Sequence, residues 1–346
     1  MTTMTYGLSA GRRNEVLGAT LKHAIPVEVL ALGCKMERMP KKQGDNITYR
    51  RWLPVGATST SVNTQNRPSV TAANHIVSEG VTPSADVLTP VDVTVTQQQY
   101  ACLYSYTDKM AELYEDDVPE EMKIQTGERM GLVREMIRFG TIKAASNVLY
   151  SGGTTRGTVD EVLTLNVVRK MTQTLQLNHA KMKTRILKPS ALYDTSAISA
   201  GYLVFCSTDL EPDIRDIPGF TPREKYASGA EVSPYELGAV ERYRFITSPE
   251  LSAYADVGAA ISGTSLYSTT GTSADVYPVI VMGEDAVYDV ALRGLNSFDV
   301  IHLPHNKEDK SDPLGQRGYV GAKFWSAVLA ANGGWYGVIE VARTAL

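Results

Sequence analysis

The sequence predicts an α+β fold, and three observations carry that prediction. An amphipathic stretch over residues 119–151 is long enough for one helix of roughly 45 Å, several times the usual helix length. Further along, short β-type runs such as 202–206 and 276–282 alternate with turns. Residues 54–90 contain no aromatic side chain and have nothing with which to form a core. We therefore expect a mixed domain, a spine helix and an excursion that leaves the domain.

Composition and charge narrow the class of protein. The chain of 346 residues is 43% hydrophobic and 21% charged, so it can bury a core in two domains, or in one with long excursions. A formal net charge of −4 disfavours an electrostatic grip on nucleic acid. No export signal and no apolar run of roughly 18 residues is evident, so we expect a protein neither exported nor embedded. Cys34, Cys102 and Cys206 lie far apart, which indicates reduced thiols in a cytoplasmic setting.

Five segments are expected along the chain. They are an N-terminal arm (1–40), an extended loop (41–98), a domain with the spine helix (99–195), a mixed domain (196–300) and closing strands (301–346). In the arm, the one apolar run at 25–32 is too short for a core. In the loop, β-type runs at 47–53 and 91–95 predict two paired strands.

Residues 54–90 between these strands are rich in Ser, Thr, Asn and Gly, with only Arg67, Glu79 and Asp86 charged. A structureless connection of this length counts against packing on its own chain. Two alternatives stay open: a disordered surface loop, or a projecting two-stranded arm laid on a neighbouring subunit.

The spine helix has a well-marked start. Pro119 suits the first helical turn, and Glu120 and Glu121 complement the positive end of the dipole. Gly152 and Gly153 are expected to stop it. Beyond it, we expect a helix at 159–177, strands at 186–190, 202–206, 243–246 and 276–282, a helical turn capped by Thr208 or Asp209, and a long strand at 318–331. Asn332 and the two glycines after it predict a hairpin that returns through residues 335–341.

Catalytic and metal-binding motifs are weak. Residues 7–11 match GxSxG around Ser9, but no apolar strand precedes them, so a chance match is favoured over a serine hydrolase. His302 and His305 lack further ligands for a metal. The acidic residues Glu115, Asp116, Asp117, Glu120 and Glu121 are most simply a solvated helix start. No phosphate-binding glycine motif is present. We expect no catalytic, cofactor or metal site, and no enzyme.

The order of segments resembles the Hong Kong 97-type (HK97) phage-capsid fold. More specifically, three stretches resemble the major capsid proteins of enquatrovirus-like (N-four-like) podophages: SEGVTP at 78–83, DVYPVIVMGEDA at 275–286 and DPLGQRGYVGAKFW at 312–325. In this resemblance, residues 41–98 are the E-loop, 99–195 the peripheral domain and 196–300 the axial domain. Residues 57–77 look like an insertion at the loop tip, and 251–273 look variable.

The resemblance implies a function and partners. Copies of the chain would form hexamers and pentamers of an icosahedral shell around phage double-stranded DNA, assembled in the bacterial cytoplasm and retained in the virion. A scaffolding protein and a portal protein are the implied partners, a decoration protein is a further candidate, and no membrane or sequence-specific DNA contact is expected. We expect inter-subunit contacts at Arg50, Arg51, Arg67, Glu79, Glu120, Glu121, Asp312, Gln316 and Arg317.

Two other readings remain beside the hydrolase. An encapsulin-like nanocompartment shell shares the fold and would enclose cargo enzymes without DNA or scaffold. A Thr-rich β adhesin or tail protein is disfavoured by the long helix, because such folds consist mainly of short strands.

Overall fold

A computed structural model describes residues 25–40, 42, 44–57, 68–83, 85–113, 117–186, 198–226, 232–261, 265–292, 299–308 and 312–345. The chain divides into two compact units. Unit 1 comprises Met1–Ile25, Ala101–Arg129 and Val300–Ala322, and unit 2 comprises Pro26–Tyr100, Met130–Asp299 and Lys323–Leu346.

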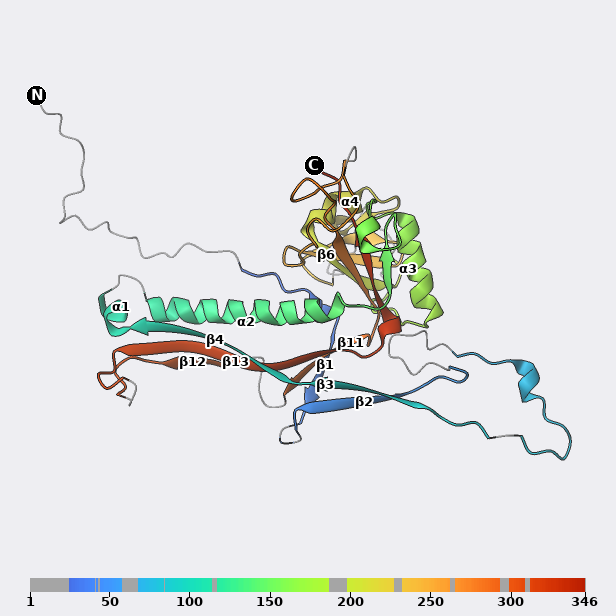
Figure 1. Cartoon of the computed structure of the whole chain (residues 1–346), viewed down its shortest axis with the longest axis horizontal. Helices are drawn as coiled ribbons and strands as arrows, with labels where there is room; N and C mark the ends of the chain where they lie inside the picture. The colour runs from blue at the N-terminus through green and yellow to red at the C-terminus, as the bar shows by residue number, and fades with distance from the viewer. Residues whose placement is uncertain are drawn as a thin grey trace, which may run out of the picture. The chain divides into compact units, whose positions relative to one another are not determined.

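Unit 2 is organised around a seven-stranded sheet (Figure 1). Its order is β5 (Val148–Tyr150), β14 (Tyr336–Val341), β10 (Tyr277–Met282), β6 (Tyr202–Ser207), β9 (Tyr243–Ser248), β8 (Glu236–Val240) and β7 (Thr221–Pro222). Every residue of β6, β10 and β14 is buried. Strands covered on both faces read as continuous apolar runs, which explains why YLVFC and YPVIV show no polar alternation.

The two faces of this sheet carry separate apolar clusters. Helix α3 (Leu165–Leu177) covers one face, with Val168 and Met171 packed among alternate strand residues. The other face is covered by the end of helix α2 (Val118–Ile142) and by residues just before the short helix η1 (Leu30–Leu32). Phe139 and Val29 are buried there. Part of the segment expected to be an arm therefore lies in the core of its own chain.

A second sheet has the order β1 (Lys35–Met39), β11 (Val287–Leu292), β13 (Arg317–Ala330) and β12 (Asp299–Leu303), and β4 (Gln98–Thr107) also pairs with β13. Within unit 2, β1 runs parallel to β11, and β11 runs antiparallel to β13. Unit 1 contains the later part of β4, helix α1 (Asp108–Leu113), the first half of α2, most of β12 and the first half of β13. There the Arg129 guanidinium lies 5.8 Å from the centre of the Tyr104 ring.

The expected strand pair is present as an antiparallel hairpin of β2 (Asn46–Trp52) and β3 (Pro90–Thr96), with Ile47 opposite Val95. A short helix η2 (Ala72–His75) lies in the loop between them. The remaining short elements are η3 (Arg156–Thr158), η4 (Thr208–Leu210), α4 (Glu211–Arg215), η5 (Arg223–Lys225) and η6 (Gly333–Trp335). Among the described residues, no helix is both long and apolar enough to cross a membrane.

The spine helix ends earlier than the sequence predicts. It spans Val118–Ile142, about 37 Å at 1.5 Å per residue, and residues 148–150 form β5 instead of its last turns. Tertiary pairing explains the difference, because Val338 N donates to Asn147 O and the Asn147 amide donates to Tyr336 O. The chain leaves the helix to pair in parallel with β14. Local periodicity cannot show this competition.

The prediction of a hairpin around Asn332 is wrong. Strand β13 lies in one sheet, whereas β14 pairs antiparallel with β10 in the other. Asn332 has φ −142°, and its side chain accepts a hydrogen bond from Gly334 N, which starts η6. Burial explains why β14 pairs with β10 and not with β13. All six residues of β14 are buried, so the strand needs cover on both faces.

Three smaller expectations also differ from the structure. Helix α3 begins at Leu165 rather than 159, because the backbone before it pairs with distant segments: Val159 O accepts from Ala259 N, and Glu161 O accepts from Ala342 N, each at 3.0 Å. The helical turn after β6 is capped by Ser207, whose hydroxyl accepts from Asp209 N, and not by Thr208 or Asp209. The strand expected at 186–190 lies, apart from Ile186, outside the described residues.

Candidate interaction surface

The β2–β3 hairpin has one covered face and one open face. Along β2, Ile47, Tyr49 and Arg51 are half-buried, and the residues between them are exposed. Strand β3 shows the same alternation, with Val91 buried. This period of two places one face of the hairpin against the sheet that contains β11 and leaves the other to solvent.

The open face carries a ladder of polar cross-strand pairs. The hydroxyl oxygens of Thr48 and Thr94 are 3.0 Å apart, and Arg50 donates to both Asp92 oxygens at 2.7 and 2.8 Å. The Arg50 guanidinium lowers the pKa of Asp92. Arg50, expected to meet a neighbouring subunit, is thus already engaged within its own hairpin.

Three contacts fasten the covered face to the rest of unit 2. The ring of Tyr49 meets the ring of Tyr288 edge to face, with centroids 5.4 Å apart. Gln97 Nε2 donates to Val290 O at 2.9 Å. Arg51 points inward, where its Nη1 donates to Ala331 O at 3.4 Å and burial lowers its pKa. A two-stranded hairpin is marginal alone, so these contacts fix its direction.

The loop beyond the hairpin is closed at its base. Ser69 N donates to Val55 O at 2.9 Å, which joins a residue just before the tip segment at 57–77 to a residue within it. Gly56 has φ +76°, and a Cβ there would lie 1.9 Å from Ser69 O. The base therefore requires glycine for two reasons, a left-handed backbone and a close approach.

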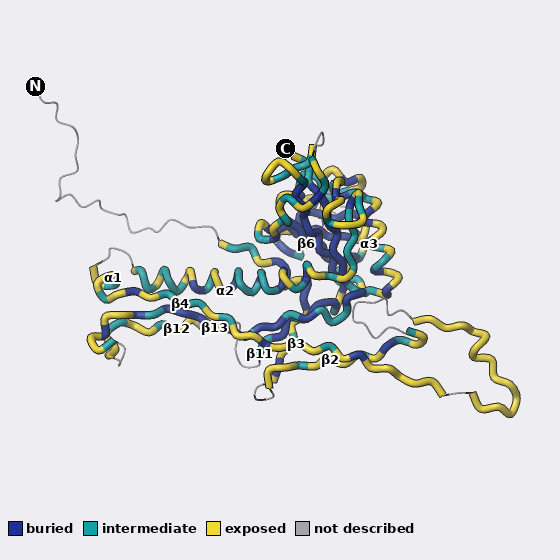
Figure 2. The backbone as a smooth tube through the Cα atoms, in the orientation of Figure 1, coloured by how far each residue is buried: buried dark blue, intermediate teal, exposed yellow. Residues whose placement is uncertain are grey.

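Beyond this base the described loop is exposed along its length (Figure 2). Residues 68–83 and 85–89 have no buried member. Large apolar side chains are exposed there at Val70, Ile76, Val77, Val81, Val87 and Leu88, and Trp52 and Val55 are exposed beside them. Contiguous exposed apolar surface of this kind is characteristic of interaction sites.

A buried ionic cluster lies where α2 crosses β11. Arg138 donates to Asp289 Oδ2 from Nε at 3.0 Å and from Nη2 at 2.7 Å, and Arg134 reaches the same oxygen at 3.3 Å. Arg138 Nη1 also donates to Glu135 Oε2 at 3.3 Å. Although burial lowers the pKa of Arg138, the neighbouring Asp289 carboxylate raises it overall.

Glu135 also holds the segment that leads into β1. Its Oε1 accepts hydrogen bonds from Val29 N at 2.8 Å and from Leu30 N at 2.7 Å. Gly131, one turn earlier, leaves room for Glu28, whose Oε1 would be 2.1 Å from a Cβ at that position. The spine helix is thereby joined to both the N-terminal segment and the sheet.

In unit 1 the expected contact residues at the helix start engage their own helix. Asp117 Oδ1 accepts from Glu120 N at 3.2 Å and caps the helix, a role that our sequence reasoning did not assign. Lys123 Nζ donates to Glu120 at 2.8 Å, and Gln125 Nε2 donates to Glu121 at 3.2 Å.

The DPLGQRG turn is fixed by main-chain contacts. Asp312 Oδ2 accepts from Arg317 N at 2.7 Å, and Gln316 O accepts from Asp108 N at 2.9 Å. The structure therefore brings Asp312, Gln316 and Arg317 together as a polar turn before β13. Nearby, Tyr106 Oη is 2.7 Å from His302 Nε2. No set of three or more candidate metal ligands is found within the part of the chain that the structure describes.

The nine expected contact residues are divided between the two units, with Arg50, Arg51, Arg67 and Glu79 in unit 2 and the other five in unit 1. Glu79 is exposed in the loop, and both Arg67 and the Ser9 motif lie outside the described residues. Sequence reasoning missed the cluster of Glu135, Arg138 and Asp289. One signal was available, because Asp289 interrupts the apolar strand run VYDVAL and therefore needs a buried partner.

Comparisons with known proteins give one curated relative and many solved structures. No protein-family model matches the chain. The relative is a major capsid protein of Pseudomonas phage KPP21, 22% identical over 274 residues. The match covers 71% of this chain and 66% of that protein, so the chain spans just under two thirds of the relative's length.

Solved phage capsids share the fold over almost the whole chain. The capsid of Ralstonia phage GP4 has a TM-score of 0.66 at 11% identity, covering 100% of this chain and 99% of that one. The capsid of cyanophage Pam1 has a TM-score of 0.60 at 16% identity, with the same coverage. The chain therefore has the HK97-type phage-capsid fold, as its sequence predicts.

Proposed function

We propose that this chain is the major capsid protein of a tailed phage, and that copies of it form the icosahedral shell around the phage's double-stranded DNA. One observation carries the proposal. The fold of solved phage capsids covers the whole chain, and the loop beyond β2 and β3 exposes apolar side chains that have no core of their own. The relative in Pseudomonas phage KPP21 supports the same role.

The exposed loop supplies the physical reason for self-association. Ile76 is 79% exposed and Val87 is 89% exposed, so burial against another copy would remove apolar surface from water. At about 25 cal/mol per Å², even a few such side chains contribute several kcal/mol to an interface. The β2–β3 hairpin is anchored to the rest of its own chain, so the loop that extends from it has a fixed direction. This limits the conformational entropy that the loop loses when it docks.

The contact residues are revised in this proposal. Glu79, which is exposed in the loop, and Arg67, which belongs to the same stretch of sequence, would meet a neighbouring copy. Glu120 and Glu121 are candidate partners because their contacts within the chain are those of a solvated helix start. Arg50 and Arg51 hold the hairpin of their own subunit. Asp312, Gln316 and Arg317 shape the turn before β13, and a contact at a local symmetry axis remains their second role.

The wider setting is part of the proposal. Hexamers and pentamers would assemble in the bacterial cytoplasm with a scaffolding protein and a portal protein, and the shell would remain in the virion with or without a decoration protein. The enquatrovirus-like subfamily fits the motifs at 78–83, 275–286 and 312–325. The role is structural and not catalytic. An encapsulin-like shell is not favoured by any contact described above.

Electron microscopy tests the proposal. The chain is expressed with its scaffolding protein, and uniform polyhedral shells are expected. A chain that stays a compact monomer under all conditions would overturn it. Deletion of residues 57–77 should leave the monomer folded, as judged by its thermal transition, but weaken or alter shell formation.

A further inference from the structure

Three consecutive glutamines lie where strand β3 meets strand β4, and the first of them is the buried one. Gln97 is 5% exposed, whereas Gln98 and Gln99 are exposed. Gln97 belongs to neither strand, since β3 ends at Thr96 and β4 begins at Gln98. A buried amide side chain between two exposed strand ends requires a hydrogen-bond partner.

The alternation of covered and open residues changes phase at this point. In β3 the covered residues are odd-numbered, namely Val91, Val93 and Val95, whereas in β4 they are even-numbered from Tyr100 onwards. Successive side chains of a regular strand point to opposite faces, so the phase can change only where the strand is interrupted. Gln97 is this interruption, and an extra residue of this kind bends the chain as a β-bulge does. Strand β3 accordingly pairs with β2, whereas β4 pairs with β13.

Gln97 holds the hairpin and the sheet at the same time. Its backbone N–H donates to Asp45 O at 2.8 Å, which closes the end of the hairpin. Its side chain reaches β11, where Nε2 donates to Val290 O at 2.9 Å. Its Oε1 has no hydrogen-bond partner among the described residues. Burying that oxygen without a partner costs free energy, so the favourable contribution of this amide comes from the Nε2 donor.

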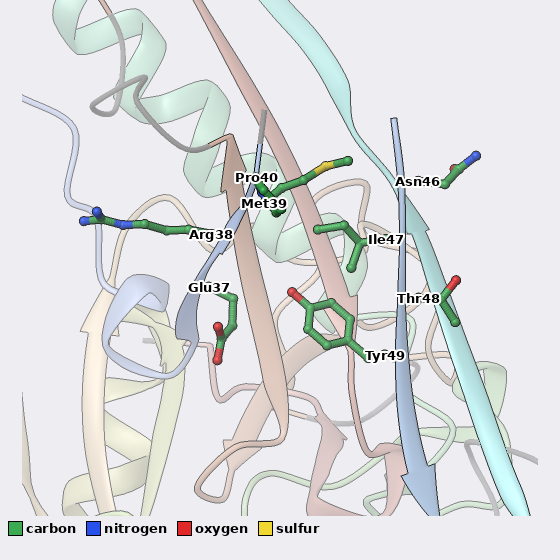
Figure 3. Close-up of a pocket in the computed structure, with 8 residues that line it drawn as sticks. All are labelled: Glu37, Arg38, Met39, Pro40, Asn46, Ile47, Thr48 and Tyr49. Carbon is green, nitrogen blue, oxygen red and sulfur yellow. The ribbon is translucent and has the colours of Figure 1, made fainter. Parts of the chain in front are cut away.

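Elsewhere the covered face of the hairpin is linked to the rest of unit 2 at separate points. The Tyr49 ring meets the Tyr288 ring, and Arg51 reaches Ala331 O at the long distance of 3.4 Å. Clefts of about 320, 200 and 400 Å³ lie around these contacts. Figure 3 shows the first cleft, into which Ile47 and Tyr49 project from β2. Because close-packed interiors leave no comparable space, the hairpin can tilt here without displacing core side chains.

We propose that Gln97 is the fulcrum of the β2–β3 hairpin, and that its hold on β11 sets the angle at which the exposed loop meets a neighbouring copy and thereby the diameter of the shell. Strand β3 is about 23 Å long at 3.3 Å per residue, so a tilt of about 10° at Gln97 moves its far end by about 4 Å. Close contacts are already lost over a gap of about 1 Å. The effect on the shell rests on the proposed function, whereas the angle is a property of the single chain.

Repetition of one contact makes the angle important. A contact between different surfaces of identical copies closes only when every copy repeats the same rotation, and otherwise it continues into an open assembly. A spread of hairpin angles would therefore become a spread of curvature. Gln97 acts as a positioning residue in this sense, because it directs the loop without contacting the neighbouring copy.

Gln97→Met and Gln99→Met form a matched pair of variants. Methionine has nearly the length of glutamine and adapts to irregular space, so Gln97→Met removes the donor to Val290 O with little change in packing. The same variant removes the unpartnered Oε1, so the two effects on stability oppose each other and the melting temperature should change little. Gln99→Met makes the same substitution at an exposed position.

Spin-label distances in the isolated subunit measure the angle. One labelled cysteine replaces exposed Trp52 on the hairpin and another replaces exposed Lys170 on α3, in a chain with Cys102→Ser because Cys34 and Cys206 are buried. The distance distribution should be about twofold wider for Gln97→Met than for the original chain, and unchanged for Gln99→Met. Among shells assembled with the scaffolding protein, only those of Gln97→Met should show mixed diameters or open sheets in electron micrographs.

The contrary outcomes are distinct from one another. An equally narrow distance distribution in Gln97→Met would overturn the fulcrum, and a wide distribution with uniform shells would overturn its control of shell diameter. If Gln97→Met lowers the melting temperature by several degrees, Gln97→Asn replaces it with the same expected result, because its amide lies one methylene further from Val290. If the original chain forms no shells, the proposed function fails, while the distances still decide whether Gln97 fixes the angle.

Discussion

Arg138 and Asp289 form a buried ion pair, in which Asp289 Oδ2 receives two hydrogen bonds from one guanidinium. Arg138 is 1% exposed and Asp289 is 0% exposed. The pair joins α2 to β11, and Glu135 extends it to Val29 and Leu30. Three segments far apart in the sequence thus depend on one set of charges.

Removing one partner of this pair should destabilise the fold strongly. Asp289→Ala removes the carboxylate that receives two hydrogen bonds from Arg138 and leaves only Glu135 at 3.3 Å and the partly exposed Glu28 at 3.9 Å. Breaking a buried pair in this way costs about 3–5 kcal/mol. Urea unfolding of the isolated subunit measures the loss. Arg169→Met is the matched control, because its pair with Glu241 is exposed and should contribute less than about 1 kcal/mol. Equal losses in the two variants would contradict a special role for the cluster.

Two glycines of the spine helix should respond to alanine by different amounts. Gly127 has open space at its Cβ position, so Gly127→Ala should stabilise the helix by about 0.5–1 kcal/mol. Gly131→Ala would meet Glu28 Oε1 at 2.1 Å and must displace it, which offsets the same gain. The difference between their melting temperatures measures the contact. Identical shifts would show that Glu28 moves at no cost.

The base of the loop should open when Gly56 is replaced. Gly56→Ala combines a strained φ of +76° with a clash against Ser69 O, whereas Gly80→Ala has the same φ and no atom within 4 Å. Proteolysis within residues 68–83 should accelerate several-fold for Gly56→Ala beyond the effect of Gly80→Ala. Equal rates would assign the effect to backbone strain alone.

Two buried thiols should make the fold sensitive to alkali. Burial raises the pKa of Cys34 and of Cys206 to about 12, from 9.0 for an exposed thiol. The stabilising effect is complete below pH 9 and is lost as pH rises towards 12, because only the unfolded chain releases these protons there. Each thiol should lower the unfolding free energy by about 1.4 kcal/mol per pH unit in that window.

The cysteine prediction is checked by unfolding between pH 8.5 and 10.5. The double variant Cys34→Ala, Cys206→Ala should show a shallower loss with pH than the original chain. Buried tyrosines such as Tyr243, whose pKa burial also raises, account for the slope that remains. A slope unchanged by the double variant would show that these thiols ionise equally in the folded and unfolded chains.

The sequence predicts elements whose signal is local. The β2–β3 pair, β6 and β13 lie within a residue or two of their expected positions, because apolar runs and β-branched residues mark them directly. The end of α2 and the partner of β14 depend instead on which segment pairs with which. Asn332 carries a hairpin signal, yet the burial of β14 on both faces overrides it.

In the candidate interaction surface, too, some features follow from the local sequence and others depend on how strands pair. Exposure of the loop at 68–83 follows from its composition, whereas the inward direction of Arg51 and the outward direction of Arg50 follow from strand register. A one-residue shift would exchange their roles. The partner of Asp289 cannot be identified from the local sequence, because Arg138 lies 151 residues away from Asp289 along the chain.

Pro90 makes the two edges of the β2–β3 hairpin chemically different. This difference bears on how many strands could join the hairpin. A ribbon with two complete edges can add strands without limit and grow into a fibre. Here the outer edge of β2 keeps all its donors and the outer edge of β3 lacks the one at Pro90, so pairing of a further strand with β3 is disfavoured. The hairpin itself therefore disfavours growth into a ribbon of unlimited length.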